Sequence, residues 1–214
     1  QGYNQPHTGR ATARRGLHAV TTPSRSVRSP ILSSAKFIAI DGPVASGKTA
    51  VGKAVARRLG WRFLDTGAMY RAVTWAAIRD GIDLEDEEAL SRLSRDLDIS
   101  LVADRAGDRL LVDGDDITDS LKRPEVDRGV SLVSKVSGVR SALVSRQRSV
   151  AEEDPTVVVG RDIGTVVLPD ARVKVYLSAP VEVRARRRHR ELVDGGKSAD
   201  YRQVVDDLVR RDGI

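Results

Sequence analysis

The stretch KFIAIDGPVASGKT, residues 36–49, decides the fold. Its first six residues are mostly apolar and predict a short strand that ends at Asp41. The remaining eight residues fit the spacing G-x-x-x-x-G-K-[ST]. Glycines at both ends of such a loop let the backbone curl until several N–H groups point at one anion. The stretch therefore predicts a strand that runs directly into a phosphate-binding loop.

Such a loop must open a helix, because the N-terminal end of a helix favours a phosphate. Val51, Val55 and Leu59 recur at i, i+4 and i+8 and predict that helix, with one apolar side. Gly60 follows, where a glycine commonly ends a helix. The alternative is a chance glycine-rich turn, but the order of strand, loop and helix favours a phosphate-binding loop.

This pattern is the phosphate-binding loop of the P-loop NTPases, so the chain is predicted to bind a nucleoside triphosphate. The lysine reaches the β- and γ-phosphates, and the hydroxyl of Thr49 is offered to Mg²⁺, which enters with ATP. The residues expected to bind ATP are Gly42, Pro43, Val44, Ala45, Ser46, Gly47, Lys48 and Thr49.

Composition bounds the class of protein. The 214 residues favour one α/β domain with an insert, and no apolar run approaches the ~18 residues of a membrane helix. There is no cysteine, which excludes disulfides and agrees with a cytoplasmic protein. The net charge of +6 arises from residues 1–36, which hold six basic residues and no acidic one. Because the remainder is neutral overall, we expect neither a nucleic-acid nor a membrane partner. We also expect the protein to be a monomer.

The expected fold is α/β: a parallel sheet flanked by helices, with an inserted monophosphate-binding subdomain and an arginine-rich lid. Residues 1–35 are expected to be a disordered or extraneous tail, with an organelle transit peptide as the alternative. Residues 36–214 are expected to form one kinase domain whose C-terminal end is incomplete. Its parts are predicted to be a core at 36–81 and 153–183, an insert at about 82–152, and a lid at about 184–200.

Local patterns place the elements after the loop. A strand at 61–64 is followed by a helix that Asp65 or Thr66 can cap and that Gly81 ends. Leu90, Leu93 and Leu97 lie on one stripe of the next helix. Strands at 99–103 and 109–112 form a hairpin across 104–108, and turn residues continue to Asp116.

The second half of the core follows the same logic. The pattern from about 126 to 150 is helical, with a break near 137–138. The β-branched runs at 156–159 and 173–177 are typical of strands buried on both faces. Because ligands bind at the carboxyl ends of parallel strands, Asp41, Asp65 and the pair at 161–162 should face one cleft.

Among P-loop proteins, GTPases are excluded because N-K-x-D is absent: the one asparagine is Asn4. Motor ATPases and helicases need a longer chain. A small core with an insert after the second strand indicates a nucleoside monophosphate kinase or a related small-molecule kinase. Residues 183–190 hold five arginines, which form either a solvated helix face or a lid that closes over the phosphates.

Three segments make the chain similar to the bacterial cytidylate kinases. They are 40–48, 64–71 (LDTGAMYR) and 160–167 (GRDIGTVV), with the shorter 146–148 (RQR) agreeing as well. The resemblance covers about 37–214. It implies transfer of the γ-phosphoryl of ATP to CMP or dCMP, giving CDP or dCDP.

The resemblance also implies roles for particular residues. Thr66 and Arg71 would hold the acceptor, Ser131 and Arg140 would read the cytosine or its phosphate, and Asp162 would hold the ribose. Arg161 and Arg211 would contact the acceptor or the transferring phosphate. The family's lid arginines match Arg187 and Arg188 best. The residues expected to be catalytic are thus Lys48, Arg161, Asp162, Arg187, Arg188 and Arg211.

Two alternatives stay open at this point. One is another small-molecule P-loop kinase, acting on UMP, shikimate or dephospho-coenzyme A. The other is a non-catalytic module that binds nucleotides or nucleic acid through its basic segments. Only 4% of the residues are aromatic, which argues against stacking on single strands.

Overall fold

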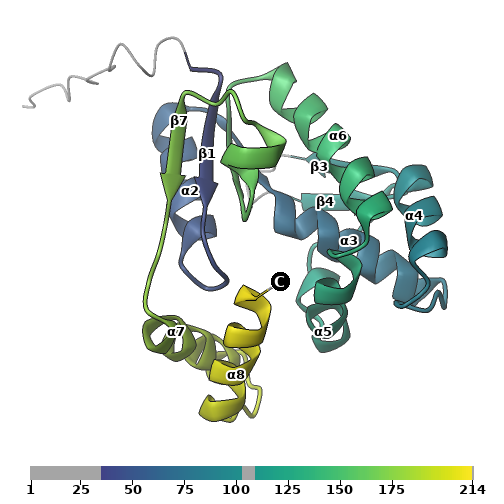
Figure 1. Ribbon diagram of the computed structural model, residues 1–214, viewed down its shortest axis with the longest axis vertical. Coiled ribbons are helices and arrows are strands. Elements are labelled where there is room, and N and C mark those ends of the chain that lie inside the picture. The colour runs from purple at the N-terminus through teal and green to yellow at the C-terminus, as the bar shows by residue number, and fades with distance from the viewer. Residues whose placement is uncertain (1–34, 103–108, 214) are drawn as a thin grey trace, which may run out of the picture.

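The computed structural model describes residues 35–102 and 109–213. The chain forms a parallel sheet with helices on both faces, an inserted α/β unit, and a C-terminal helical hairpin (Figure 1). In chain order the elements are β1 (Phe37–Asp41), α2 (Lys48–Leu59), β2 (Arg62–Asp65), α3 (Thr66–Arg79), α4 (Glu87–Asp96), β3 (Ile99–Val102), β4 (Arg109–Val112), β5 (Asp115–Asp116), η1 (Ser120–Lys122), α5 (Pro124–Val133), α6 (Ser137–Glu153), β6 (Thr156–Gly160), η2 (Ile163–Val167), β7 (Val173–Tyr176), α7 (Val181–Asp194) and α8 (Tyr201–Asp212). The predicted α/β class with a parallel sheet is confirmed.

The core sheet has the strand order β2-β6-β1-β7, with every pair parallel. Ile38 and Ile40 of β1 pack with Val157 and Val159 of β6 on the face that α2 covers. Ala39 points to the opposite face, into the larger apolar core that α3 and α6 complete. The alternation places two hydrophobic layers on one sheet, so the ends of β1 and β6 are held in fixed positions.

Helix α2 lies closer to the sheet than the sequence suggests. Val51, predicted on its apolar side, is 40% exposed, and the buried residues are Gly52 and Ala56. A Cβ on Gly52 would come within 2.6 Å of Val159. The predicted apolar side is therefore correct at Val55 and Leu59, which pack against the core, and wrong at Val51, because small residues at i and i+4 let the helix backbone approach the strand.

Strand β7 differs from the prediction of a strand buried on both faces. Tyr176 is 70% exposed and Val175 is 41% exposed. Among the described residues β7 pairs with β1 alone, so it forms the edge of the sheet and its other side is uncovered. The β-branched pattern indicated a strand correctly but could not show its position in the strand order.

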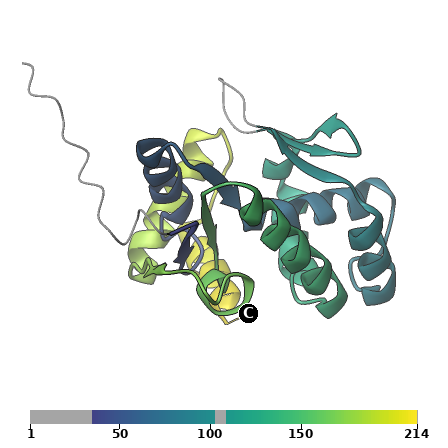
Figure 2. The same cartoon turned by 90° about the horizontal axis from the view of Figure 1, so that it is seen from above.

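The insert lies to one side of the sheet (Figure 2) and shares one hydrophobic cluster with it, which joins Ala39 and Val158 to Leu110 and Val139. The predicted hairpin of β3 and β4 is confirmed, while its turn at 104–108 lies outside the described residues. Asp115 and Asp116, predicted as turn residues, instead pair with β4 through a tight turn in which Asp113 and Gly114 have positive φ. The break between α5 and α6 falls at 134–136, just before the predicted position.

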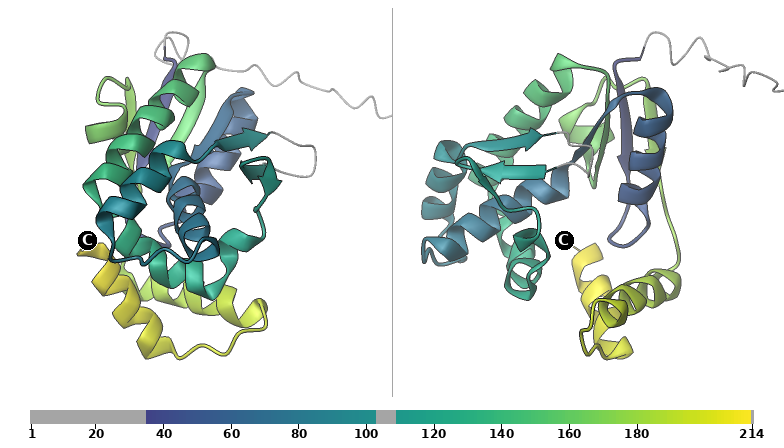
Figure 3. Two further views of the ribbon diagram at one scale, coloured as in Figure 1. Left: turned by 90° about the vertical axis from the view of Figure 1, so that its right-hand side faces the viewer. Right: turned by 180° about the vertical axis from the view of Figure 1, so that it is seen from behind.

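The last two helices form a hairpin that packs against the loop between β1 and α2. Ala185, Val204 and Leu208 make a small core of their own, and Val44 and Ala45 of the loop lie against it. Seen from behind, α8 extends from this hairpin toward the space between that loop and α5 (Figure 3). The predicted boundaries of core, insert and lid stay predictions. Within the described residues no helix has the length and apolar character to cross a bilayer.

Candidate functional site

The loop at 42–49, called here the phosphate loop, takes its shape from its backbone. Gly42 has a φ of 152°, and a Cβ there would meet the carbonyl oxygen of Leu177 at 2.1 Å. Ala45 also has a positive φ, of 59°. The N–H of Ser46 donates to the carbonyl of Pro43 at 3.3 Å, which closes the loop. The chain therefore fixes an anion-binding curve directly before α2.

Lys48 lies in the mouth of this loop. Its Nζ donates to the carbonyl of Pro43 at 2.7 Å. Burial and, next, the nearby Arg161 lower the pKa of Lys48 to about 8, although Asp65 and Asp41 act in the opposite direction. A partly desolvated ammonium next to another cation is a site at which an anion is strongly favoured.

Thr49 and Asp65 bring oxygen atoms together beside the loop. The hydroxyl of Thr49 donates to Oδ2 of Asp65 at 2.9 Å, and Oδ1 accepts from the N–H of Gly67 at 3.0 Å. Asp65 thus caps α3, as predicted. Hard oxygen donors of this kind suit Mg²⁺. Among the described residues no group of three His, Cys, Asp or Glu side chains could hold a metal ion.

Asp41 joins two strand ends. Its carboxylate accepts from the N–H groups of Ile163 at 2.7 Å and Gly164 at 2.8 Å, which are the first residues of η2. The carboxylate therefore fixes the turn that carries Arg161 and Asp162. Asp41 is a positioning residue.

A second polar group lies at the start of η2. Arg140 of α6 forms an ion pair with Asp162. Tyr70 of α3 lies close to both, and burial raises the pKa of its phenol above the ordinary value. A groove of about 640 Å³ runs along α6 and includes Arg140 and Val166 but no residue of the phosphate loop. Arg140, Asp162 and Tyr70 therefore form a polar group at the carboxyl end of β6.

The third group is an arginine cluster around one carboxylate. Asp127 of α5 contacts Arg71 of α3 at 2.8 Å, Arg188 of α7 at 2.6 Å and Arg211 of α8 at 3.5 Å. Burial alone would raise the pKa of Asp127, but these guanidinium groups outweigh it and lower the pKa to about 2. Arg71, Arg188, Arg211 and Asp127 are called the arginine cluster below.

Arg161 connects this cluster to the phosphate loop. Its Nη1 donates to the carbonyl of Arg211 at 2.7 Å, and its charge lowers the pKa of Lys48. Burial lowers the pKa of Arg161 itself. The structure thus brings Lys48, Arg161 and Arg211 into one electropositive region.

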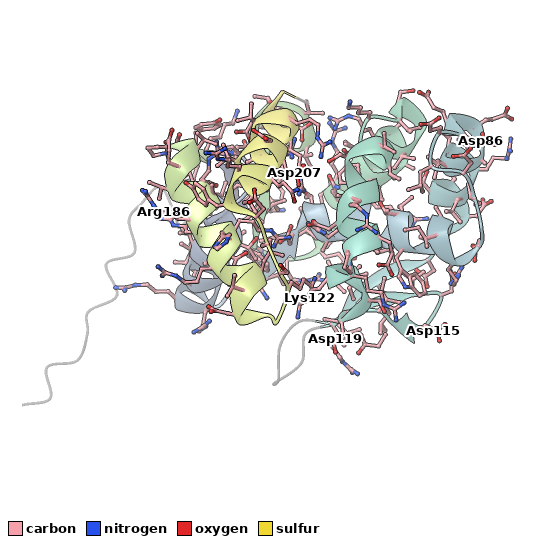
Figure 4. The ribbon with its side chains drawn as sticks, turned by 90° about the horizontal axis from the view of Figure 1, so that it is seen from below. Asp86, Asp115, Asp119, Lys122, Arg186 and Asp207 are labelled. Atoms are coloured by element: carbon pink, nitrogen blue, oxygen red, sulfur yellow. The ribbon has the colours of Figure 1, made fainter. Side chains whose placement is uncertain are left out.

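The arginine run on α7 divides into three kinds of residue. Arg184 is buried and donates to the carbonyl of Val44 at 3.0 Å and to both oxygens of Asp212. Arg187 donates to the carbonyl of Ser46 at 3.2 Å, and Arg188 belongs to the arginine cluster. Arg186 and Arg190 are exposed, and Figure 4 shows Arg186 on the outer side of the hairpin. The exposed Arg186 and Arg190 agree with a solvated helix face, and the lid stays a prediction.

Two residues predicted to bind the acceptor, Thr66 and Ser131, belong to none of the three groups described above. The hydroxyl of Thr66 is buried and donates to the carbonyl of Val159 at 2.9 Å, so it ties α3 to β6. Ser131 is half-buried on α5. The RQR segment supports the fold, since Arg146 donates to carbonyls at the end of α4 and Arg148 donates to those of Val166 and Val167. The roles of the predicted site residues stay predictions.

Sequence reasoning missed Asp127, Tyr70 and Asp212. Asp127 precedes Ser131 by one helical turn, and nothing in its neighbourhood along the chain marks it as a partner of three distant arginines. Tyr70 lies inside the LDTGAMYR motif, next to Arg71, and this adjacency is the signal that could have identified it. Asp212 directly follows Arg211 and could have been considered with it.

The parallel sheet, the phosphate loop and the surrounding arginines define a P-loop phosphotransferase. The family model described as cytidylate kinase matches residues 38–214. The cytidylate kinase of Geobacillus kaustophilus is 49% identical over 83% of this chain and 79% of that protein. Those of Caldanaerobacter subterraneus subsp. tengcongensis and Bacillus subtilis are 46% and 44% identical, also over 83% of this chain, and over 77% and 79% of their own lengths.

The chain therefore belongs to the cytidylate kinase family. This confirms the resemblance drawn from the three sequence motifs. Among solved structures, a shikimate kinase from Acinetobacter baumannii in complex with shikimate is similar at a TM-score of 0.39 and 19% identity. It covers 85% of this chain and 79% of its own, and a likeness at that level carries no argument about the acceptor.

Proposed function

We propose that this protein transfers the γ-phosphoryl group of ATP to CMP or dCMP, giving CDP or dCDP. The observation that carries the proposal is the position of Arg161. It joins Lys48 of the phosphate loop to Arg211 of the arginine cluster, so that sites for two phosphorylated ligands share one electropositive region.

The donor binds at the phosphate loop. Backbone N–H groups and the N-terminal end of α2 face the β- and γ-phosphates, and Lys48 leaves the carbonyl of Pro43 to contact them. Arg187, which contacts the carbonyl of Ser46, lies where it can follow the charge on the transferring group. Thr49 and Asp65 would hold the Mg²⁺ that enters with ATP, and the ion would neutralise further phosphate charge.

The acceptor binds on the side of the insert. Its phosphate is a dianion, and Arg71, Arg188 and Arg211 present guanidinium groups that match phosphate oxygens. The Arg140–Asp162 pair beside Tyr70 provides the donors and acceptors that a cytosine edge and a ribose require. Ser131 lies on the same helix as Asp127 and completes the proposed acceptor site.

The reaction needs little covalent help from the protein. An oxygen of the acceptor phosphate forms a bond to the γ-phosphorus, the bond from that phosphorus to the bridging oxygen breaks, and ADP leaves with the electron pair. Lys48, Arg161 and Arg188 stabilise the charge that spreads over the transferring group. Closure of the α7–α8 hairpin keeps water from taking the place of the acceptor.

A coupled ADP-release assay tests the proposal, with CMP, dCMP, UMP and AMP as parallel acceptors and a reaction without acceptor as the control. We expect turnover with CMP and dCMP to exceed that with the other acceptors, and we expect little ATP hydrolysis without one. Turnover of UMP or AMP equal to that of CMP would contradict the proposal. A monomeric state and a cytoplasmic location stay predictions, and size-exclusion chromatography with light scattering measures the former.

A further inference from the structure

The arginine cluster already contains an anion that belongs to the protein. Asp127 lies on α5, whereas its partners lie on α3, α7 and α8, at least 56 residues away along the chain. Both carboxylate oxygens are used: Oδ1 contacts Arg71 and Arg211, and Oδ2 contacts Arg188. The carboxyl side chain is 25% exposed, so these contacts are partly shielded from water.

These are the same guanidinium groups that the proposed function assigns to the acceptor phosphate. In this structure Asp127 therefore contacts the groups proposed to bind the phosphate. The contact also joins α5 to the α7–α8 hairpin. At the tip of that hairpin Lys197 donates to the carbonyl of Lys122 at 3.3 Å, and Figure 4 shows Lys122 beside the loop that connects the two helices.

The charge balance leaves room for a second anion. Arg71, Arg188 and Arg211 carry three positive charges, and Arg161 adds a fourth close by. The two carboxylates that face Arg161, those of Asp212 and Asp162, are already paired with Arg184 and Arg140. Asp127 and the exposed Glu191, which contacts Arg188 at 3.4 Å, supply two negative charges. Nε of Arg211 is buried and has no hydrogen-bond partner among the described residues. The excess of about two positive charges and the unused donor match a phosphate dianion.

We propose that Asp127 is a built-in counter-anion that the acceptor phosphate must displace, so that its charge sets the affinity of the site for that phosphate. The proposal rests on the proposed function for the identity of the ligand. Two anions near the same three arginines repel each other, and in a partly buried site this repulsion is only weakly screened. Asp127 thus holds the arginines together and weakens acceptor binding, which favours release of the product.

Replacement of Asp127 by the nearly isosteric asparagine tests this directly. We expect Asp127→Asn to bind inorganic phosphate and CMP about tenfold more tightly than the parent protein, as measured by isothermal titration calorimetry. The affinity for ATP should stay within about twofold. A residue that only supported the arginines structurally would give the opposite sign, because its loss would weaken phosphate binding.

Control variants separate the effect of the charge of Asp127 from general effects of a substitution. Asp207→Asn removes the same charge from an exposed pair with Arg210 on α8 (Figure 4) and should leave phosphate binding unchanged. Asp127→Ser gives a second neutral variant if the asparagine protein unfolds, and thermal unfolding reports on this. Equal or weaker phosphate binding in a folded neutral variant overturns the proposal. Since the phosphate titration requires no turnover, failure of the proposed kinase activity is seen separately, in the acceptor assay.

Discussion

The phosphate loop and the arginine cluster both present positive groups to a phosphate, but the chain builds them in opposite ways. Eight consecutive residues form the loop, and its shape comes from the backbone, as at Gly42. The arginine cluster takes its four side chains from α3, α5, α7 and α8. In the loop, the ammonium of Lys48 contacts the backbone carbonyl of Pro43. In the arginine cluster, the guanidinium groups contact the carboxylate of Asp127.

This difference shows which part of the site is fixed locally and which part depends on the packing of helices. The loop is fixed locally by backbone geometry and by Arg184, so it exists before any ligand arrives. The cluster exists only while the α7–α8 hairpin and α5 are close together, because its members belong to separate elements. Donor binding should therefore depend on single residues of the loop, and acceptor binding should depend on the arrangement of helices.

The largest effect should come from the loop lysine. We expect Lys48→Ala to lower kcat by about 10²–10³-fold, because one preorganised charge on the transferring group is removed. The measurement is steady-state turnover with Mg·ATP and CMP, accompanied by circular dichroism to verify the fold. Arg57→Ala, on the exposed side of the same helix, is the control and should keep full activity. A Lys48→Ala enzyme with normal kcat would contradict the assignment of phosphoryl transfer to this loop.

The next effect tests how the hairpin is fixed to the loop. Arg184→Ala leaves Asp212 without its buried partner and should lower the free energy of unfolding by about 3 kcal/mol. Urea unfolding measures this. Arg186→Ala, two residues away and exposed, should change stability by less than about 0.5 kcal/mol. Equal effects of the two variants would mean that α7 is not anchored through Arg184.

A smaller effect should separate the acceptor from the donor. Arg71→Ala removes a charge-assisted contact to the acceptor phosphate, and we expect kcat/KM for CMP to fall about 10- to 100-fold. The KM for ATP should remain within about twofold. Arg79→Ala changes an exposed arginine at the end of the same helix and serves as the control. A rise in the KM for ATP as large as that for CMP would contradict the division of the site.

The smallest expected effect is the uptake of a fraction of a proton when ATP binds. The pKa of Lys48 is lowered to about 8, and the phosphates of ATP should raise it again. At pH 8 we therefore expect ATP binding to take up about half a proton. Calorimetric titrations in buffers of different ionisation enthalpy measure this uptake, which Lys48→Met should abolish. Release of a proton would contradict the prediction.

The same shift has a consequence for stability. Because the pKa of Lys48 in the folded protein lies below its unfolded value of 10.5, the unfolded chain binds more protons at this lysine between about pH 8 and 10.5. The contribution of Lys48 to stability therefore grows as the pH rises through this window. Lys48→Met should remove that part of the pH dependence of unfolding.

Local patterns in the sequence predicted the features that depend on interactions between residues close together in the chain. The loop, the cap at Asp65, the end of α3 near Gly81 and the β3–β4 pairing all follow from residues close together in the chain. Long-range arrangement decided the rest. The exposure of Tyr176 depends on strand order, and the burial of Gly52 in place of Val51 depends on how closely α2 meets β6.

The site shows the same limit. The sequence marked Arg71, Arg188 and Arg211 as phosphate ligands through family motifs, but it could not show that they meet on Asp127. That contact depends on the packing of four helices, and an aspartate on a helix surface carries no sequence signal of its partners. The run at 184–190 looked uniform for the same reason, although its arginines differ. Arg184 is a buried anchor, Arg187 is exposed but contacts the phosphate loop, and the half-buried Arg188 contacts Asp127.

The most direct test of a locally built donor site and a separately assembled acceptor site is calorimetric titration of CMP into Lys48→Ala, with Arg71→Ala as the comparison. The account predicts that Lys48→Ala binds CMP within about threefold of the parent affinity, whereas Arg71→Ala loses about tenfold or more. If Lys48→Ala lost CMP binding as strongly as Arg71→Ala, the loop and the arginine cluster would be one indivisible site, and the account would be wrong.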